Sequence, residues 1–132
     1  MSPERRAVVD ASLVVDFVLG GRGAAAIAQR LVGLELWAPA HLDMEVLSAL
    51  GRMQRAGELS AEAVEERLGH AASIPVHRHL LADLVPGAWA RRGDVRLADA
   101  VYVELAAQLG VPLLTTDARL GRAVPLAEVL TI

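Results

Sequence analysis

Short apolar runs alternate with longer helical segments along this chain, and this alternation is the feature that most restricts its fold. The runs lie at Ala7–Val9, Leu34–Ala38, Ile74–His77, Val111–Thr115 and Val129–Ile132. Continuous apolar runs of this kind are typical of strands that are buried on both faces. Because segments with helical spacing separate them, the pattern predicts a parallel sheet with helices packed on both sides.

The expected helices are recognised by apolar residues at helical spacing and by capping residues at their ends. They cover the residues around Leu13–Val18, then Ala24–Leu31, Leu42–Met53 with an end near Gly57, Ser60–Gly69, Leu80–Arg91, Ala98–Leu109 and Ala118–Arg122. Asp94 is the expected N-cap of the Ala98–Leu109 helix. A chain of 132 residues has the length of one domain. We therefore expect a single α/β domain over residues 1–132, with three α/β/α layers around a short central parallel sheet of four to five strands.

The composition excludes several classes of function. The chain has no cysteine, which excludes disulfides, thiolate nucleophiles and zinc ribbons. Its thirteen basic residues are all arginine, so mechanisms that need a lysine ammonium group are excluded as well. The longest stretch without a charge or a histidine is Leu105–Thr116, shorter than the ~17–25 residues of a membrane-spanning helix. We expect a cytoplasmic protein without a membrane segment, because no signal-peptide pattern is visible.

Four acidic residues fall where predicted strands end or predicted helices begin. Asp10 directly follows the first apolar run, and Asp117 follows Val111–Thr115. Asp99 and Glu45 lie near the starts of two predicted helices, beside the apolar stripe of each. Two of these acids also have a structural explanation, since Asp10 would cap the next helix and Asp99 would interact with a helix dipole. In a parallel α/β domain these positions share one edge, so together they predict a common site.

Carboxylates gathered in this way need a counter-charge. Burying even one of them costs several kcal/mol unless it is paired, and the chain has no lysine to pair with them. A hard divalent cation with oxygen ligands is the natural partner. Mg²⁺ fits best, with Mn²⁺ as a substitute, because cysteine is absent and the histidines are scattered. Such an ion supports the hydrolysis of phosphodiester bonds.

Four segments carry these acids in a fixed order along the chain. They are Val8–Ser12, Glu45–Leu50, Leu97–Ala106 and Leu113–Leu120. The segments resemble the PIN domain, and more narrowly the VapC toxins of bacterial toxin–antitoxin pairs, over essentially the whole chain. The resemblance implies a PIN-like fold and a Mg²⁺-dependent endoribonuclease whose partners are RNA, a VapB-like antitoxin and a second copy of the chain.

The resemblance also implies roles for individual residues. The predicted metal ligands are Asp10, Glu45, Asp99 and Asp117, and the predicted supporting hydroxyl groups are Ser12 and Thr115. Arg119 matches a basic position that is common after the last acid, and Asp16 follows at a place near the site or on an exposed helix face.

Two other interpretations remain open at the level of sequence: a PIN nuclease for RNA processing without an antitoxin, and a binding module without catalytic activity. The net charge of −3 is unfavourable for binding RNA. Five arginines lie close in sequence to Asp99 and Asp117, and we expect them to rim the acidic centre: Arg91, Arg92, Arg96, Arg119 and Arg122. Among the apolar residues expected outside the core, as interface positions, are Trp37, Leu59 and Val64.

Overall fold

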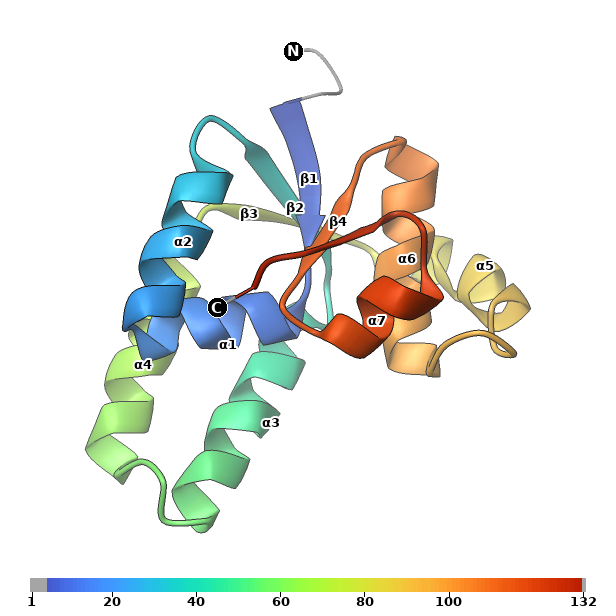
Figure 1. The fold of residues 1–132 in the computed structure, drawn as a ribbon. Coiled ribbons are helices and arrows are strands. Elements are labelled where there is room, and N and C mark those ends of the chain that lie inside the picture. Colours follow the sequence, from blue (N-terminus) through green and yellow to red (C-terminus); the bar gives the residue numbers. More distant parts are fainter. Residues whose placement is uncertain (1–4, 132) are drawn as a thin grey trace.

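A five-stranded parallel sheet forms the centre of the computed structural model, which describes residues 5–131 (Figure 1). Its strands are β1 (Arg6–Val9), β2 (Glu35–Pro39), β3 (Val76–His79), β4 (Leu113–Thr115) and β5 (Ala127–Val129). They lie in the order β3-β2-β1-β4-β5, and all four pairings are parallel. The predicted parallel sheet is therefore confirmed.

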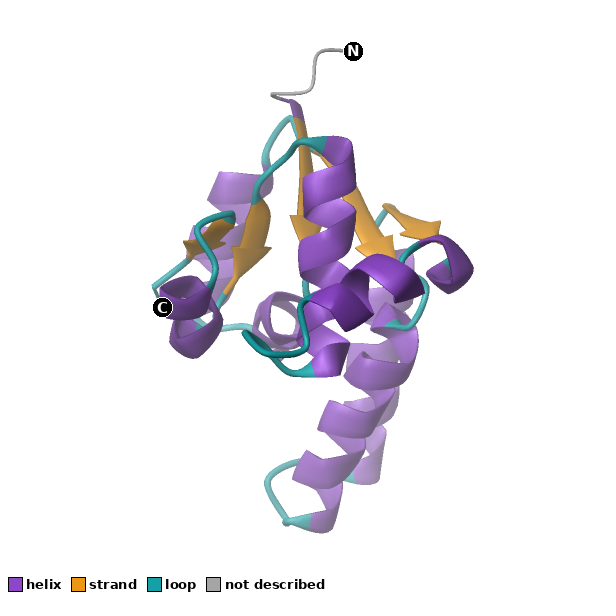
Figure 2. Ribbon diagram, turned by 90° about the vertical axis from the view of Figure 1, so that its right-hand side faces the viewer, coloured by secondary structure: helices purple, strands orange, loops and turns teal. Residues whose placement is uncertain are grey.

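Helices cover both faces of this sheet. They are α1 (Ala11–Leu19), α2 (Arg22–Leu31), α3 (Leu42–Arg55), α4 (Ala61–Ser73), α5 (Val85–Ala90), α6 (Leu97–Leu109) and α7 (Ala118–Ala123), with a 3₁₀ turn at Leu81–Asp83. Figure 1 shows α1 and α2 on one side of the strands and α5 and α6 on the other. This arrangement confirms the α/β/α layers. In Figure 2, α3 and α4 form a hairpin that extends beyond the sheet.

The burial of β1 and β4, which pair with each other inside the sheet, explains the apolar runs at these two strands. In β1, Ala7 and Val8 are fully buried, and in β4 Leu113 and Leu114 are fully buried. Tyr102 of α6 is the bulkiest of the side chains in residues 5–131 that are less than 2% exposed. No helix in this part of the chain is long and apolar enough to cross a membrane.

The strand order reverses between β1 and β4. From β1 the chain moves outward to β2 and β3, and it then returns to place β4 on the other side of β1. In parallel α/β sheets, ligands bind beyond the carboxyl ends of the strands at such a reversal. Asp10 follows β1 and Thr115 ends β4, so the fold brings these two residues to that place.

Several element boundaries differ from those expected. The segment Leu80–Arg91 is not one helix, because α5 begins only at Val85, with Pro86 in its first turn, where a missing N–H costs nothing. The strand expected at Ile74–His77 begins at Val76, after Pro75, which has no N–H for the sheet. The last strand ends at Val129, earlier than expected, and Ile132 lies outside the described residues.

Two further expectations were wrong. Asp94 is not the N-cap of α6; that position belongs to Arg96, whose side chain makes no capping hydrogen bond. Trp37, Leu59 and Val64 do not lie outside the core but pack against it, half-buried.

Candidate active site

Asp10 is the most deeply buried acid of the predicted site. It is only 5% exposed and is the N-cap of α1, where its Oδ1 accepts a hydrogen bond from the Leu13 backbone N at 3.0 Å. Ser12 Oγ donates to the same Oδ1 at 2.8 Å, and Thr115 Oγ1 donates to Oδ2 at 2.5 Å. The structural and functional interpretations of Asp10 are therefore compatible, because capping leaves the carboxylate at the edge of the sheet.

The environment of Asp10 changes its acidity. Burial removes water from the carboxylate and raises its pKa to about 6, while the three hydrogen bonds act in the opposite direction. The negative charge of Asp99 raises the pKa further. A nearby cation would remove this penalty, since an opposite charge favours the ionised form.

Ser12 in the first turn of α1 contacts Thr115 at the end of β4. Their hydroxyl oxygens lie 3.2 Å apart, and Thr115 is completely buried. Thr115 Oγ1 also accepts a hydrogen bond from the backbone N of Asp117 at 3.0 Å. The two hydroxyl groups thus fix the carboxylate of Asp10 and the start of the loop that carries Asp117.

Glu45 is held from two directions. The phenol group of Tyr102 donates a hydrogen bond to Glu45 Oε1 at 2.6 Å, and His41 Nε2 lies 3.4 Å from the same oxygen. Burial and the contact with Glu45 raise the pKa of Tyr102 above its ordinary value, so its hydroxyl group stays protonated and donates the hydrogen bond. The His41 ring also packs against the ring of Tyr102, with centroids 4.9 Å apart.

Asp99 and Asp117 each contact an arginine. Arg96 Nε donates to Asp99 Oδ2 at 3.1 Å, which raises the pKa of Arg96. Asp117 is the N-cap of α7 and accepts a hydrogen bond from the backbone N of Arg119 at 2.9 Å. Partial burial acts to raise the pKa of Asp117, but hydrogen bonds from the Arg119 backbone and side chain outweigh it and lower that pKa.

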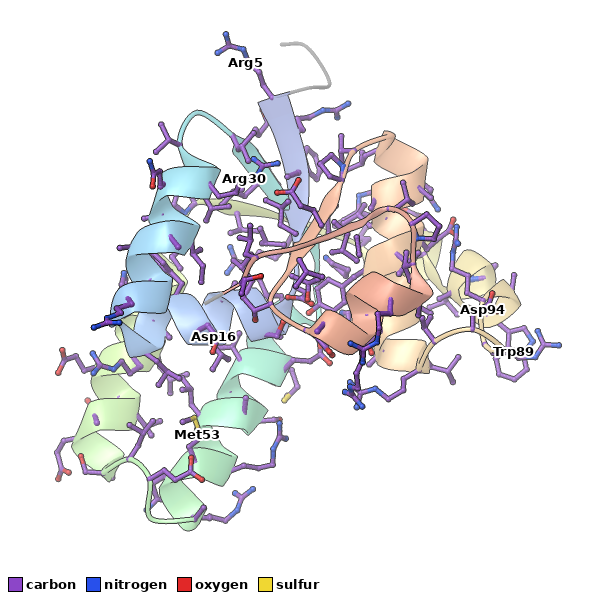
Figure 3. The ribbon with its side chains drawn as sticks, viewed as in Figure 1. Arg5, Asp16, Arg30, Met53, Trp89 and Asp94 are labelled. Atoms are coloured by element: carbon purple, nitrogen blue, oxygen red, sulfur yellow. The ribbon has the colours of Figure 1, made fainter. Side chains whose placement is uncertain are left out.

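The four predicted acids line one pocket of about 310 Å³. Its polar lining consists of Asp10, Ser12, Asp16, Glu45, Arg52, Arg96, Asp99, Tyr102 and Asp117. Figure 3 shows Asp16 on α1 above the α3–α4 hairpin, and its Oδ2 accepts a hydrogen bond from Thr116 Oγ1 at 2.6 Å. Asp16 is therefore half-buried beside the site rather than exposed on a helix face.

In residues 5–131, no three acidic or histidine side chains are grouped closely enough to hold a metal ion as they stand. Three of the four acids point at tyrosine or arginine partners instead. The residues nevertheless fit a hard divalent ion, because all four acids offer carboxylate oxygens to one pocket. The buried carboxylate of Asp10 also has no cationic partner among the residues that the structure describes.

The arginines are arranged differently from the expected rim. Of the five arginines predicted to form it, Arg96 and Arg119 contact the acids of the site. Arg91 pairs with Glu104, and Arg92 stacks over Trp89 at 4.7 Å. The fifth, Arg122, lies near the end of α7 and lines none of the pockets around the acids.

Comparisons with known proteins identify the family of this chain. The PIN domain family model matches residues 7–124. Ribonuclease VapC3 of Mycobacterium tuberculosis is 51% identical over 128 residues, which cover 96% of this chain and 93% of that protein. This chain belongs to the PIN domain family, in its VapC branch. The predicted family membership is confirmed.

Solved structures share the PIN fold at low identity. VapC20 of Mycobacterium tuberculosis, described as a Sarcin-Ricin loop cleaving toxin, superposes with a TM-score of 0.64 and 17% identity, over 89% of this chain and 94% of that one. A toxin–antitoxin complex from Klebsiella pneumoniae gives a TM-score of 0.61 and 15% identity, over 92% and 95% of the two chains. These likenesses show that the PIN fold of this VapC chain also occurs in distant proteins.

The sequence does not predict every side chain that contacts the acids. The spacing of Tyr102 indicates only a place in the apolar stripe of its helix, and His41 looks isolated along the chain. The spacing of His41 and Glu45, four residues apart, is an available signal, because such residues are neighbours on one helix face. Arg52 also lines the pocket from α3, seven residues after Glu45 and therefore on the same helix face, which is a second available signal.

Proposed function

We propose that this chain is a Mg²⁺-dependent endoribonuclease and the toxin of a toxin–antitoxin pair. The proposal rests on one observation above all: Asp10, Glu45, Asp99 and Asp117 line a single pocket at the carboxyl edge of the sheet. Membership of the PIN family and similarity to a protein named as a ribonuclease support RNA as the substrate. Metal binding is assigned to these four acids, and catalysis to the same acids together with Ser12 and Thr115.

Carboxylate oxygens from these acids would hold the ion, and Mn²⁺ is expected to replace Mg²⁺. When bound, the ion supplies an activated water and neutralises the charge that develops on the leaving oxygen. Ser12 and Thr115 keep the carboxylate of Asp10 in place through their hydroxyl groups. Tyr102 does the same for Glu45.

The decisive experiment is single-turnover cleavage of RNA in Mg²⁺ by the wild type and by Asp10→Asn. This substitution removes one ligand charge at nearly constant volume, so we expect a folded protein whose cleavage is slower by at least about 100-fold. Asp99→Asn should behave in the same way, and Ser12→Ala should lose about 10- to 100-fold. Circular dichroism of each variant checks the fold.

Asp43→Asn is the matched control. Asp43 lies in the first turn of α3, as Glu45 does, but it pairs with Arg78 outside the pocket. The control should cleave RNA at the wild-type rate. Full activity in a folded Asp10→Asn protein would falsify the proposed function.

Metal binding is measured separately from cleavage. A ligand that binds only the folded state must raise its stability, so millimolar Mn²⁺ should raise the melting temperature of the wild type. The increase should be smaller in Asp10→Asn. If Mn²⁺ leaves the wild-type melting temperature unchanged, the acids of the pocket do not hold an ion.

An antitoxin and a second copy of the chain are the proposed protein partners. Inhibition of RNA cleavage by the product of an adjacent small gene tests the first partner. Active cleavage without any such inhibitor would favour a PIN nuclease of RNA processing instead. The absence of both cleavage and metal binding would favour a binding module.

A further inference from the structure

Arg96 and Arg119 reach the acids of the pocket from the solvent side. Arg96 Nε lies 3.1 Å from Asp99 Oδ2, and Arg119 Nη2 lies 3.4 Å from Asp117 Oδ2. Both arginine side chains are 70% exposed, whereas the side chains of Asp99 and Asp117 are 20% and 22% exposed. Each guanidinium group is therefore a solvent-exposed counter-ion on a largely buried carboxylate.

A second pocket of about 170 Å³ adjoins the first beside these ion pairs. Asp99, Asp117 and Arg96 line both pockets, and Arg119 lines only the smaller one. The backbone of Arg96 is fixed, because its carbonyl oxygen accepts a hydrogen bond from the Ala100 N at 2.8 Å. A turn of Arg96 from the acid toward a ligand in the smaller pocket therefore needs only a rotation of its side chain.

We propose that Arg96 and Arg119 exchange partners when a divalent ion binds Asp99 and Asp117. Each guanidinium group then moves from its carboxylate to an RNA phosphate group next to the cleaved bond. The inference rests on the proposed function, because it assumes that the acids hold an ion. The exchange costs little, since an exposed ion pair contributes only about 0.2–1 kcal/mol. A guanidinium group fits phosphate as well as carboxylate.

This exchange has two consequences of opposite sign. The arginines compete with the ion for the acids, so removing either arginine strengthens metal binding. The same arginines bind phosphate in the metal-loaded protein, so removing either one weakens RNA binding. An arginine with a merely structural role would not change the two affinities in opposite directions.

The first measurement is calorimetric titration of the RNA-free protein with Mn²⁺. Arg96→Gln and Arg119→Gln should bind Mn²⁺ about 1.5- to 5-fold more tightly than the wild type, which corresponds to the loss of one exposed ion pair. Two matched controls should show the wild-type affinity. Arg92→Gln alters an arginine that stacks on Trp89, and Arg122→Gln alters one that shares α7 with Arg119 but lines neither pocket.

The second measurement is the salt dependence of binding to a labelled single-stranded RNA, with Ca²⁺ as the ion. Each phosphate contact contributes about 0.7 to the slope of log affinity against log salt for single strands. The slope should therefore be shallower by about 0.7 in Arg96→Gln and in Arg119→Gln, and unchanged in both controls.

The inference is overturned if the two variants bind Mn²⁺ no more tightly than the wild type, or if all four variants lose RNA affinity alike. In either case the proposed function stands, provided that the wild type binds Mn²⁺ and cleaves RNA. If the wild type does neither, the proposed function is wrong, and the inference is wrong with it.

Discussion

At the scale of single residues, Asp10 couples the stability of the protein to pH. Its pKa is about 6 in the folded protein and 3.8 in an unfolded chain, because burial penalises the charged form. Between about pH 4 and pH 6 the folded state therefore holds a proton that the unfolded state has lost. In this window the free energy of unfolding should fall as pH rises, by on the order of 3 kcal/mol.

Asp10→Asn isolates this effect, since asparagine does not titrate. In EDTA, the difference in unfolding free energy between the variant and the wild type should grow from about pH 4 to pH 6 and stay constant above. Acids that do not interact with Asp10 contribute equally to both proteins and cancel in the difference. Urea unfolding of both proteins across this pH range measures the difference. If the free energy of unfolding depends on pH in the same way in the two proteins, the burial of an ionised Asp10 is contradicted.

Tyr102→Phe tests how Glu45 is held. The variant keeps the buried ring but removes the hydroxyl group that donates to Glu45 Oε1. Groups that orient a metal ligand typically contribute about 10- to 100-fold to metal affinity, so Mn²⁺ affinity should fall by about 10-fold or more. The free energy of unfolding should fall by about 1 kcal/mol.

Ser73→Ala is the control for Tyr102→Phe, because it removes a hydroxyl hydrogen bond at the end of α4, outside the pocket. Its Mn²⁺ affinity should equal that of the wild type. Wild-type Mn²⁺ affinity in Tyr102→Phe as well would show that Glu45 is oriented without the phenol group.

The positions of the site acids could be predicted from sequence, but their partners could not. Asp10 and Asp117 follow apolar runs, so they are expected at strand ends. In any parallel α/β sheet, the ends of strands and the starts of helices lie at the same edge. The partner of Glu45 depends instead on how α6 packs across the sheet. Tyr102 has the spacing of a core residue and is buried like one, and only its three-dimensional position brings its hydroxyl group to Glu45.

At the scale of elements, α7 packs against β5 through a glycine. A Cβ atom at Gly121 would overlap the Cγ2 atom of Val129. Gly121→Ala should therefore destabilise the protein by about 1–3 kcal/mol, although alanine favours helices more than glycine does. Gly121→Ala combined with Val129→Ala should recover part of this loss, because the second change removes the overlapping methyl group.

Gly69→Ala in α4 is the matched comparison. A Cβ atom at Gly69 would have no neighbouring atom within 4 Å, so the helix preference of alanine should stabilise the protein by about 0.5–1 kcal/mol. Thermal and urea unfolding of the variants measure both effects. Stabilisation by Gly121→Ala would show that α7 does not pack closely on β5.

The ends of elements were harder to predict than the elements themselves. The helix predicted to end at Gly69 continues to Ser73, because one glycine costs a helix only about 1 kcal/mol, and packing compensates for this cost. The strand expected from Val111 begins at Leu113, since the backbone N of Val111 donates to the Ala106 carbonyl at the end of α6. Such local competition for hydrogen bonds is not visible in apolar spacing.

At the scale of the whole molecule, the exposed apolar surface was the least predictable property. Trp37 and Trp89 look alike in sequence, yet Trp37 packs against the core beside His77, and Trp89 is 58% exposed. The difference arises from position, because Trp37 belongs to a strand covered by helices, whereas Trp89 belongs to a short helix at the periphery. In Figure 3 the Trp89 side chain points away from the rest of the molecule.

Val85 and Trp89 form an exposed apolar pair on α5, four residues apart and therefore on one helix face. Exposed apolar patches usually mark interfaces, and we expect this pair to contribute to a homodimer. Val85→Ser combined with Trp89→Ser should shift a micromolar solution from dimer to monomer in analytical ultracentrifugation. Val32→Ser alters a side chain that is 78% exposed between α2 and β2, and it should leave the dimer intact. A wild-type monomer at tens of micromolar, or equal dissociation by Val32→Ser, would exclude α5 as the dimer contact.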